Sequence, residues 1–189
     1  MYSSRNATIL AILKDEESSV FRIADVAMLT GETKENNLVQ RLRYWVKQGY
    51  LVSPCKGIYA KPNFSFEELA CKLYVPSYIS LDTVLYKEGI ISQYAETVSS
   101  VSYLSRTISI GEKEIRYRKI KNDIIINFDG IIRGQINIAT PERAFLDTLY
   151  LNPNYYFDNI ERLNQDKIKA LLPIYQSSTL NKRVKKWLT

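Results

Sequence analysis

Apolar residues recur at helical spacing in three stretches near the start of the chain, and each stretch ends where a residue interrupts the pattern. The first predicted helix covers residues 4–14. The second follows a short extended entry in VFRIADVAMLTG and closes near Gly31, because glycine tolerates the left-handed backbone of a helix end. The third covers residues 34–47, with Thr33 as its cap and Gly49 as its stop.

Two β-rich runs follow the third helix and surround a Pro-Cys-Lys-Gly turn. They cover residues 50–53 and 58–60 and are typical of a short hairpin. Three helices followed by a hairpin is the order of elements in a winged helix-turn-helix. The sequence therefore predicts such a domain over residues 1–62, with a boundary at Pro62-Asn63.

The remainder, residues 63–189, is predicted to form a second domain. SFEELACKLY and SLDTVLYKEG indicate short helices that Ser65 and Ser80 would cap, and TPERAFLDTLYL indicates a helix opened by a Thr-Pro pair. Between them, residues 97–137 contain the candidate strands TVSSVSYL, RTISI, EIRYRKIK, DIIINF and GQINIA. We therefore expect an α+β protein whose second domain holds a small antiparallel sheet with flanking helices.

The third predicted helix has two chemically different sides. At 3.6 residues per turn, Leu38, Leu42 and Trp45 fall on one side, while amides and cations, but no acid, occupy the opposite arc. Amides can bond adenine and Arg can bond guanine, whereas a carboxylate would repel phosphate. Lysines of the hairpin would lie near the adjacent DNA backbone as a wing. The candidate DNA-binding residues are Asn36, Asn37, Gln40, Arg43, Tyr44, Lys47, Lys56 and Lys61.

The net charge of +6 is distributed unevenly along the chain. Residues 1–62 and 151–189 carry +3 and +4, while residues 63–150 carry −1. A polyanionic partner that contacts both ends of the chain would explain this distribution. Basic surfaces that contact only water would explain it as well. The terminal NKRVKKWLT leaves the same two alternatives: a solvated helix face with Trp187 docked on the body, or a second phosphate-contacting patch.

Little in the sequence favours catalysis. There is no histidine, no nucleophile or phosphate-loop motif, and the two cysteines form no metal-ligand cluster. A nuclease core would combine Asp123 or Asp129 with GEKEIRYRK, but alternating charges there suit one solvated strand face, with Ile115 and Tyr117 pointing inward. We expect a cytoplasmic protein that is not an enzyme and binds no metal or cofactor. Neither a membrane helix nor a secretory signal is predicted.

Two motifs occur in order around the β-like segment: GIYAKPNFSFEELACKLYVPSYISLDTVLYKEGII at residues 57–91 and IATPERAFLDTLYL at residues 138–151. Together they resemble the AbiEi-like antitoxins, transcriptional regulators of type IV toxin–antitoxin (abortive infection) systems. That family shows a Gly-x-Tyr wing strand, a "YIS…S/T-x-L…G" helix and an "IATPEKALLDLLYL"-like helix. The resemblance covers roughly residues 20–151. The residues that match the first two marks are Gly57, Tyr59, Tyr78, Ile79, Ser80, Leu85 and Gly89.

The resemblance implies a transcriptional repressor that binds inverted repeats in double-stranded DNA upstream of its own operon. It also implies that the C-terminal domain neutralises a nucleotidyltransferase-type toxin without a stable complex. The residues alone leave open a winged-helix protein-interaction module that neutralises a toxin by direct binding. In TPERAFLD, Glu142, Arg143 and Asp147 can form helix-surface or domain ion pairs, or can act in neutralisation. Without a coiled-coil heptad, we expect a monomer whose copies meet on DNA.

Overall fold

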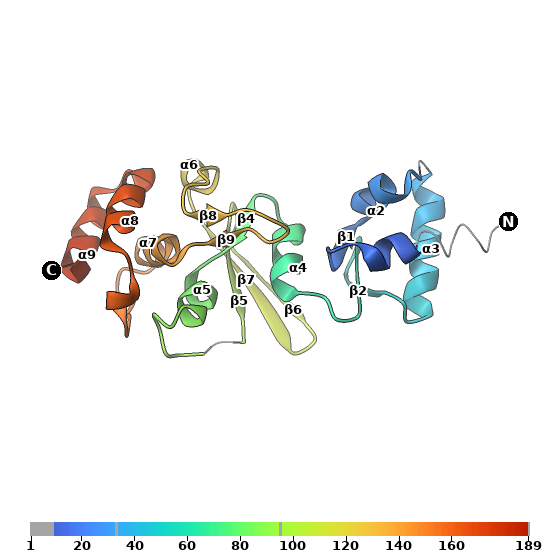
Figure 1. Cartoon of the computed structure of the whole chain (residues 1–189), viewed down its shortest axis with the longest axis horizontal. Coiled ribbons are helices and arrows are strands. Elements are labelled where there is room, and N and C mark those ends of the chain that lie inside the picture. Colours follow the sequence, from blue (N-terminus) through green and yellow to red (C-terminus); the bar gives the residue numbers. More distant parts are fainter. Residues whose placement is uncertain (1–9, 33, 95, 189) are drawn as a thin grey trace. The chain divides into compact units, whose positions relative to one another are not determined.

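A computed structural model describes residues 10–32, 34–94 and 96–188 of the chain. The chain divides into two compact units, Met1–Leu73 and Tyr74–Thr189, and each unit contains its own β-sheet (Figure 1). Helices and sheets are combined in both units, so the predicted α+β class is confirmed.

The first unit is built around a three-stranded antiparallel sheet with the order β1-β3-β2. The unit contains a helical turn at residues 10–15, β1 (Val20–Arg22), α2 (Ile23–Thr30), α3 (Glu35–Lys47), β2 (Val52–Cys55), β3 (Ile58–Ala60) and α4 (Phe66–Leu73). The second and third predicted helices and the hairpin are therefore present. Part of the predicted helix at residues 4–14, and the predicted cap Thr33, lie outside the described residues.

Local sequence explains the boundaries of α2 and α3. Gly31 ends α2 with φ 63°, and Gly49 follows α3 with φ 76°, both in the left-handed region that glycine accepts at low cost. Glu35 in the first turn of α3 and Lys47 in its last turn both complement the helix dipole. The helix thus has defined ends even though Lys34, at its N-cap position, makes no side-chain cap bond.

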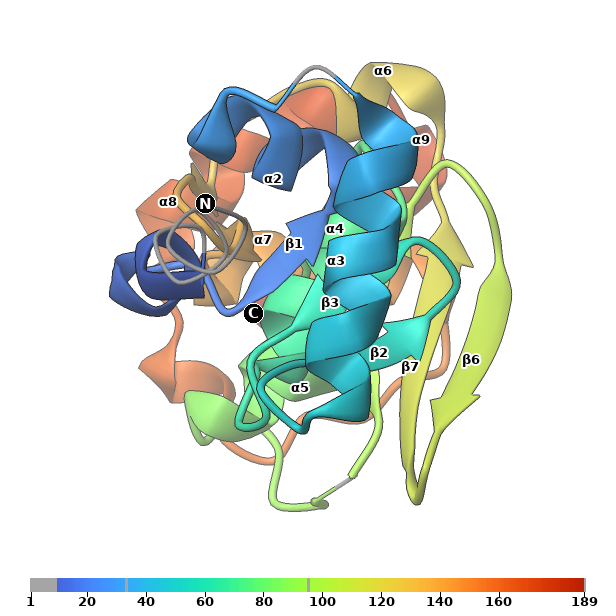
Figure 2. The ribbon, with the colours of Figure 1, turned by 90° about the vertical axis from the view of Figure 1, so that its right-hand side faces the viewer.

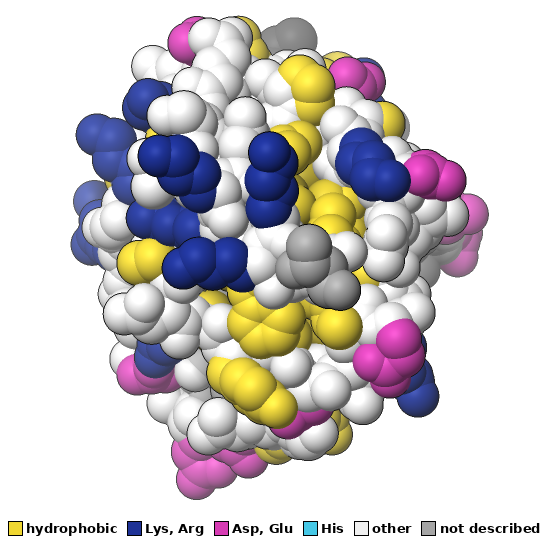
Figure 3. All heavy atoms as spheres, turned by 90° about the vertical axis from the view of Figure 1, so that its left-hand side faces the viewer, with side chains coloured by type: hydrophobic (Ala, Val, Ile, Leu, Met, Phe, Trp, Pro, Cys, Tyr) yellow, Lys and Arg dark blue, Asp and Glu magenta, His cyan; other side chains and the backbone are white. Residues whose placement is uncertain are grey.

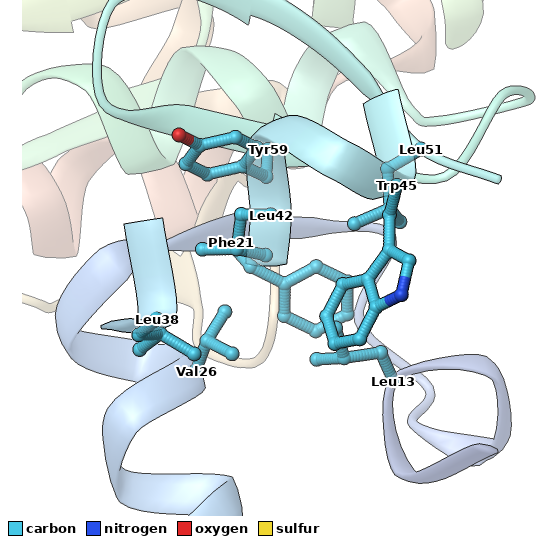
Figure 4. Close-up of a cluster of buried hydrophobic side chains, with 8 residues drawn as sticks. All are labelled: Leu13, Phe21, Val26, Leu38, Leu42, Trp45, Leu51 and Tyr59. Carbon is cyan, nitrogen blue, oxygen red and sulfur yellow. The ribbon is translucent and has the colours of Figure 1, made fainter. Parts of the chain in front are cut away.

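The core of the first unit collects apolar side chains from the first helical turn, β1, α2, α3, β3 and the loop before β2 (Figure 4). Leu38, Leu42 and Trp45 of α3 are buried in it, as the helical projection predicted. The other members of this cluster are Leu13, Phe21, Val26, Leu51 and Tyr59. Burying side chains of this size stabilises a unit by roughly 1.5–3 kcal/mol each, which fixes α3 on the sheet through one face only.

The helix α4 belongs to the first unit, although Pro62-Asn63 was the predicted boundary. Its buried Glu68 accepts hydrogen bonds from the backbone N–H groups of Ser19 and Val20, at 2.8 and 3.2 Å. Lys72 also forms an ion pair of 3.0 Å with Asp25 of α2. Ser65 caps the helix as predicted, but the Glu68 carboxylate reaches β1 instead of completing a capping box. The division after Leu73 follows from these contacts.

The second unit contains a six-stranded sheet with the order β6-β7-β5-β4-β9-β8. Its elements are β4 (Ser77–Ile79), α5 (Leu81–Lys87), β5 (Val98–Ser102), β6 (Arg106–Ile110), β7 (Lys113–Lys119), α6 (Asn122–Ile125), β8 (Ile131–Ile132), β9 (Ile138–Ala139), α7 (Pro141–Leu151), η1 (Ile160–Arg162), α8 (Gln165–Leu171), η2 (Leu172–Tyr175) and α9 (Ser178–Leu188). Helices α5 and α7 pack on each other and on the sheet, and α8 and α9 pack on α7.

The sheet is mixed, so the prediction of an antiparallel sheet was wrong in this respect. Strand β5 runs parallel to β7, and β4 runs parallel to β9. Strand β6 pairs with the edge of β7 that faces away from β5 and runs antiparallel to β7. It therefore brings the chain back to the start of β7, as the connection between two parallel strands must do. The alternation in β7 was correctly predicted, because Ile115 and Tyr117 are buried while Arg116 and Arg118 are exposed. The segment DIIINF is wrong as a strand: its first three residues belong to α6 and the others to the turn and loop after it.

No helix in the described ranges is long and apolar enough to cross a membrane.

Candidate nucleic-acid interface

The outer face of α3 is the best-defined candidate surface of the first unit. Figure 2 shows α3 lying across the front of the three-stranded sheet, with α2 beside it. The core face of α3 is held by Leu38, Leu42 and Trp45, so the opposite side chains project away from the sheet. The predicted residues of this arc are all exposed: Asn36, Asn37, Gln40, Arg43, Tyr44 and Lys47.

The polar groups of this face are available for an external partner. Among the residues that the structure describes, no side chain of the six forms a hydrogen bond or an ion pair. The neighbouring acid Glu32, in the turn before α3, is paired with Arg41 at 3.1 Å. Arg41 lies outside the arc and is half-buried, so this pair neutralises a carboxylate without using a cation of the exposed face.

The hairpin after α3 presents one of its two predicted lysines to solvent. Lys56 is exposed at the β2–β3 turn, where Gly57 adopts φ 79° and allows the tight reversal. Ser53 Oγ donates a hydrogen bond of 3.0 Å to the carbonyl of Ile58 across the hairpin. The turn is therefore fixed, while the Lys56 side chain is exposed to solvent.

Lys61 occupies a different environment from the other candidates. Its Nζ donates hydrogen bonds to the backbone carbonyls of Lys14 and Glu16, at 3.1 and 2.5 Å. These carbonyls lie at the end of the first helical turn, where helix ends leave acceptors unsatisfied. The structure brings seven of the eight predicted residues to α3 and the hairpin turn, and it ties the ammonium of Lys61 to the body of the unit.

The basic C-terminal helix α9 combines solvated and docked side chains. Figure 3 shows Lys and Arg side chains gathered on part of the face that the last helices present. Trp187 packs edge-on against Phe157, with ring centroids 5.2 Å apart, as the docking alternative expected. Arg183 Nη1 donates to the carbonyl of Leu149 at 2.8 Å and so caps the end of α7. Lys182, Lys185 and Lys186 remain exposed.

The two motifs that carry the family resemblance meet inside the second unit. The buried Asp147 of α7 accepts hydrogen bonds from Tyr78 of β4, Ser80 and Tyr175, the last at 2.6 Å. Arg143, one turn earlier, is also fully buried, and its Nε lies 3.5 Å from the Asp147 carboxylate. We refer to these five residues as the buried network.

Burial sets the electrostatics of the buried network. It raises the pKa of Asp147, while the Arg143 guanidinium and the three hydroxyl donors act in the opposite direction. Burial also raises the pKa of Tyr78 and of Tyr175, so both phenols remain hydrogen-bond donors near neutral pH. The sequence predicted helix-surface or domain ion pairs for these charges. The pair of Arg143 and Asp147 is present, but it is buried inside the unit and does not lie at a helix surface. Ser80 likewise bonds Asp147 and does not cap α5 with its side chain.

The groups considered for catalysis are dispersed. Asp123 and Asp129 are exposed on α6 and in the turn after it. Within the described ranges, no three His, Cys, Asp or Glu side chains gather as a metal-ligand set. Cys71 is buried, and partial burial raises the pKa of the Cys55 thiol, which reduces its thiolate fraction.

Comparison with known proteins establishes a likeness of fold alone. No protein-family model and no curated protein match the sequence significantly. Among solved structures, the chain is similar to the crystal structure of the RV2827C protein from Mycobacterium tuberculosis, with a TM-score of 0.57 and 10% identity. The match covers 98% of this chain and 76% of that chain.

Proposed function

We propose that this chain is a sequence-specific transcriptional repressor whose first unit is a winged helix-turn-helix. In this proposal α3 enters the major groove of double-stranded DNA, and the β2–β3 hairpin is the wing. The observation that carries it is the exposed, acid-free arc of α3, whose side chains form no hydrogen bond or ion pair within the described chain. The Glu32 carboxylate beside this face is paired with Arg41, and Glu35, in the first turn of α3, lies outside the arc.

The proposal assigns different roles to the neutral and the charged side chains of this surface. Gln40 lies in the first half of α3, where amides reach base edges, while Lys56 lies on the hairpin near the phosphates. Replacing Gln40 with alanine should cost about 1–3 kcal/mol on a specific duplex and little on a scrambled one. Replacing Lys56 with alanine should weaken both alike and lower the magnitude of the salt slope by about one.

The measurement is binding to a duplex selected by the full chain from random sequences, and to its scrambled version, over several salt concentrations. Gln48→Ala, just beyond α3, and Lys87→Ala, in the second unit, are matched exposed controls that should bind like the wild type. Equal binding by all four variants would remove α3 from the DNA contact.

In the same proposal the second unit carries the antitoxin function of a type IV pair. The support is the family resemblance, together with the convergence of its two motifs, around Tyr78 and around Arg143 and Asp147, on one buried network. Because this network is fully buried, it would act by shaping the unit rather than by touching a toxin. The proposed partner is a nucleotidyltransferase-type toxin that forms no stable complex with this chain.

Separate expression of the two units tests this division of labour. Residues 74–189, produced beside a nucleotidyltransferase encoded next to this gene, should restore growth, and residues 1–73 should not. Residues 1–73 should instead retain most of the binding to the selected duplex. Rescue by residues 1–73 alone would contradict the assignment, and each fragment is first checked for folding by circular dichroism.

One observation favours a second candidate, a winged-helix module that binds a protein. Met28 of α2 is exposed, as is Leu29 beside it, and exposed apolar side chains next to a candidate recognition helix suit a protein partner. This alternative replaces the first if the α3 variants leave DNA binding unchanged while Met28→Asp abolishes toxin neutralisation.

A further inference from the structure

The segment from α6 to β8 exposes large apolar side chains in an unusual concentration. Ile126 is 62% exposed, Phe128 46% and Ile132 63%. Among the described residues, no other isoleucine or phenylalanine has a side chain as exposed as these three. Other large exposed apolar residues of the second unit are mostly tyrosines, whose hydroxyl groups suit water.

This segment lies at a free margin of the six-stranded sheet. β8 is the last strand in the order, and its outer side pairs with no strand in the described ranges (Figure 1). The guanidinium of Arg133, directly after β8, lies 4.5 Å from the centroid of the Phe128 ring. We define the β8 edge surface as Ile126, Phe128, Ile132 and Arg133. Aromatic side chains and arginine, such as Phe128 and Arg133 here, are enriched at the centres of protein interfaces.

The backbone beneath the β8 edge surface is fixed by the buried network. Arg143 Nη2 donates to the carbonyl of Ile124 at 2.8 Å, and its Nη1 donates to that of Asp129 at 3.0 Å. The N–H of Thr140 donates to the carbonyl of Gly130 at 2.8 Å. A fully buried cation therefore holds both sides of the exposed turn. Such a surface loses little conformational freedom when it binds, which favours association.

We propose that the β8 edge surface is the contact between two copies of this chain bound to neighbouring half-sites on DNA. The inference rests on the proposed function, because DNA brings the copies together. The charges of the segment favour a second copy as the occupant. The chain carries +6 overall, so two copies repel each other, but residues 121–133 hold two basic and two acidic residues. Lys121, Asp123, Asp129 and Arg133 are all exposed.

A patch that holds equal numbers of acidic and basic residues can also be complementary to a second copy of itself. In a two-fold contact the same residues face each other in both directions, so Arg133 of one copy can approach an acid of the other twice. A strongly basic patch, such as the exposed lysines of α9, would oppose such a contact. Self-association is therefore least hindered by charge at the β8 edge surface.

The size of the surface explains why the contact would depend on DNA. Three side chains with these exposures present on the order of 300 Å², below the roughly 800 Å² per partner of a stable complex. A contact of this size gives a monomer at ordinary concentrations. On adjacent half-sites the effective concentration reaches the millimolar range, which is sufficient for a weak contact to form. The expected result is cooperative binding of about 5–150-fold.

The test compares Ile132→Asp and Ile126→Asp with a matched control, Tyr94→Asp. Tyr94 is 63% exposed, like Ile132, and its replacement introduces the same charge elsewhere on the second unit. In the first arm, sedimentation equilibrium without DNA follows the full chain up to about 1 mM. In the second arm, binding is measured on duplexes with one or two copies of the selected half-site.

The wild type and Tyr94→Asp should self-associate weakly near the top of the concentration range and bind two half-sites cooperatively. Both isoleucine variants should remain monomeric and bind the two half-sites independently, with unchanged affinity for one half-site. Wild-type behaviour of both variants overturns the inference, as does a wild type that neither self-associates nor binds cooperatively. If no duplex is bound by any variant, the proposed function fails; self-association that both isoleucine substitutions abolish would then support only the contact between two copies at the β8 edge surface.

Discussion

Replacing Arg143 with methionine is expected to remove about 3–5 kcal/mol from the free energy of unfolding of the second unit. Methionine fills the space of the buried arginine only as far as Nε, so a cavity at the end of the guanidinium contributes part of the loss. The larger part is electrostatic. It comes from Asp147, which would remain buried without its cation, and from the carbonyls of Ile124 and Asp129, which would lose their donors. A loss of this size is a large fraction of the stability of a small domain.

The variant should also acquire a distinct pH dependence. Burial already raises the pKa of Asp147, and removal of the opposing guanidinium should raise it further. A carboxyl whose pKa is higher in the folded than in the unfolded state binds more protons when folded. Its contribution is therefore favourable at low pH and is lost as pH rises from the unfolded pKa, about 3.9, through the folded pKa. Arg143→Met should be more destabilised at pH about 8 than at pH about 5.

Urea unfolding of the full chain at these two pH values measures both effects. The chain has two tryptophans, Trp45 in the first unit and Trp187 in the second, so fluorescence reports on each unit. Arg118→Met, on the exposed face of β7, is the control and should cost little. Adding Asp147→Asn to Arg143→Met should recover part of the loss, because no buried charge remains. Unfolding of Arg143→Met at the wild-type urea concentration would contradict a stabilising role.

Periodicity was sufficient to predict the two faces of α3, because both faces are properties of one continuous helix. The apolar side of this segment is buried in the core, and the opposite side is exposed. The same reasoning placed Ile115 and Tyr117 inside the second unit, since alternation along a strand is equally local. Periodicity does not show whether the exposed arc contacts DNA, so the DNA contact stays a prediction.

Long-range pairing limited the prediction elsewhere. DIIINF is a short apolar run, and such runs do not distinguish a strand from a buried helical turn; here Ile124 and Ile125 are buried in α6. Lys61 follows the hairpin in sequence, but its ammonium group meets carbonyls near residue 14, which spacing does not reveal. The buried network joins Tyr78 to a helix 69 residues later. The i, i+4 spacing of Arg143 and Asp147 was the available signal, although an exposed ion pair has the same spacing.

Two buried centres, one in each unit, therefore underlie the proposed division of function. The buried network supports the β8 edge surface in the second unit, and the apolar cluster of the first unit supports the exposed arc of α3. The side chains of both centres are buried. A substitution in either centre therefore changes function only by altering the surface that the centre supports. This distinction between supporting and contacting residues can be tested with adjacent aromatic residues on α3.

Trp45→Ala should destabilise the first unit by about 3–5 kcal/mol, while Tyr44→Ala should leave its stability nearly unchanged. The two residues are neighbours in sequence, but Trp45 is 2% exposed and lies in the core, whereas Tyr44 is 55% exposed on the opposite arc. Removing the indole leaves a cavity among Leu13, Leu42 and Leu51, so α3 loses its attachment to the sheet.

The proposed function also predicts how these two variants bind DNA. Trp45→Ala should bind the selected duplex poorly and recover affinity at low temperature, where more of the first unit is folded. Tyr44→Ala should remain folded at all temperatures at which the wild type is folded, with any loss of affinity independent of folding. Thermal unfolding by circular dichroism and duplex binding at two temperatures separate these effects. If Trp45→Ala unfolds the first unit and still binds the duplex with wild-type affinity, the DNA contact does not lie on α3.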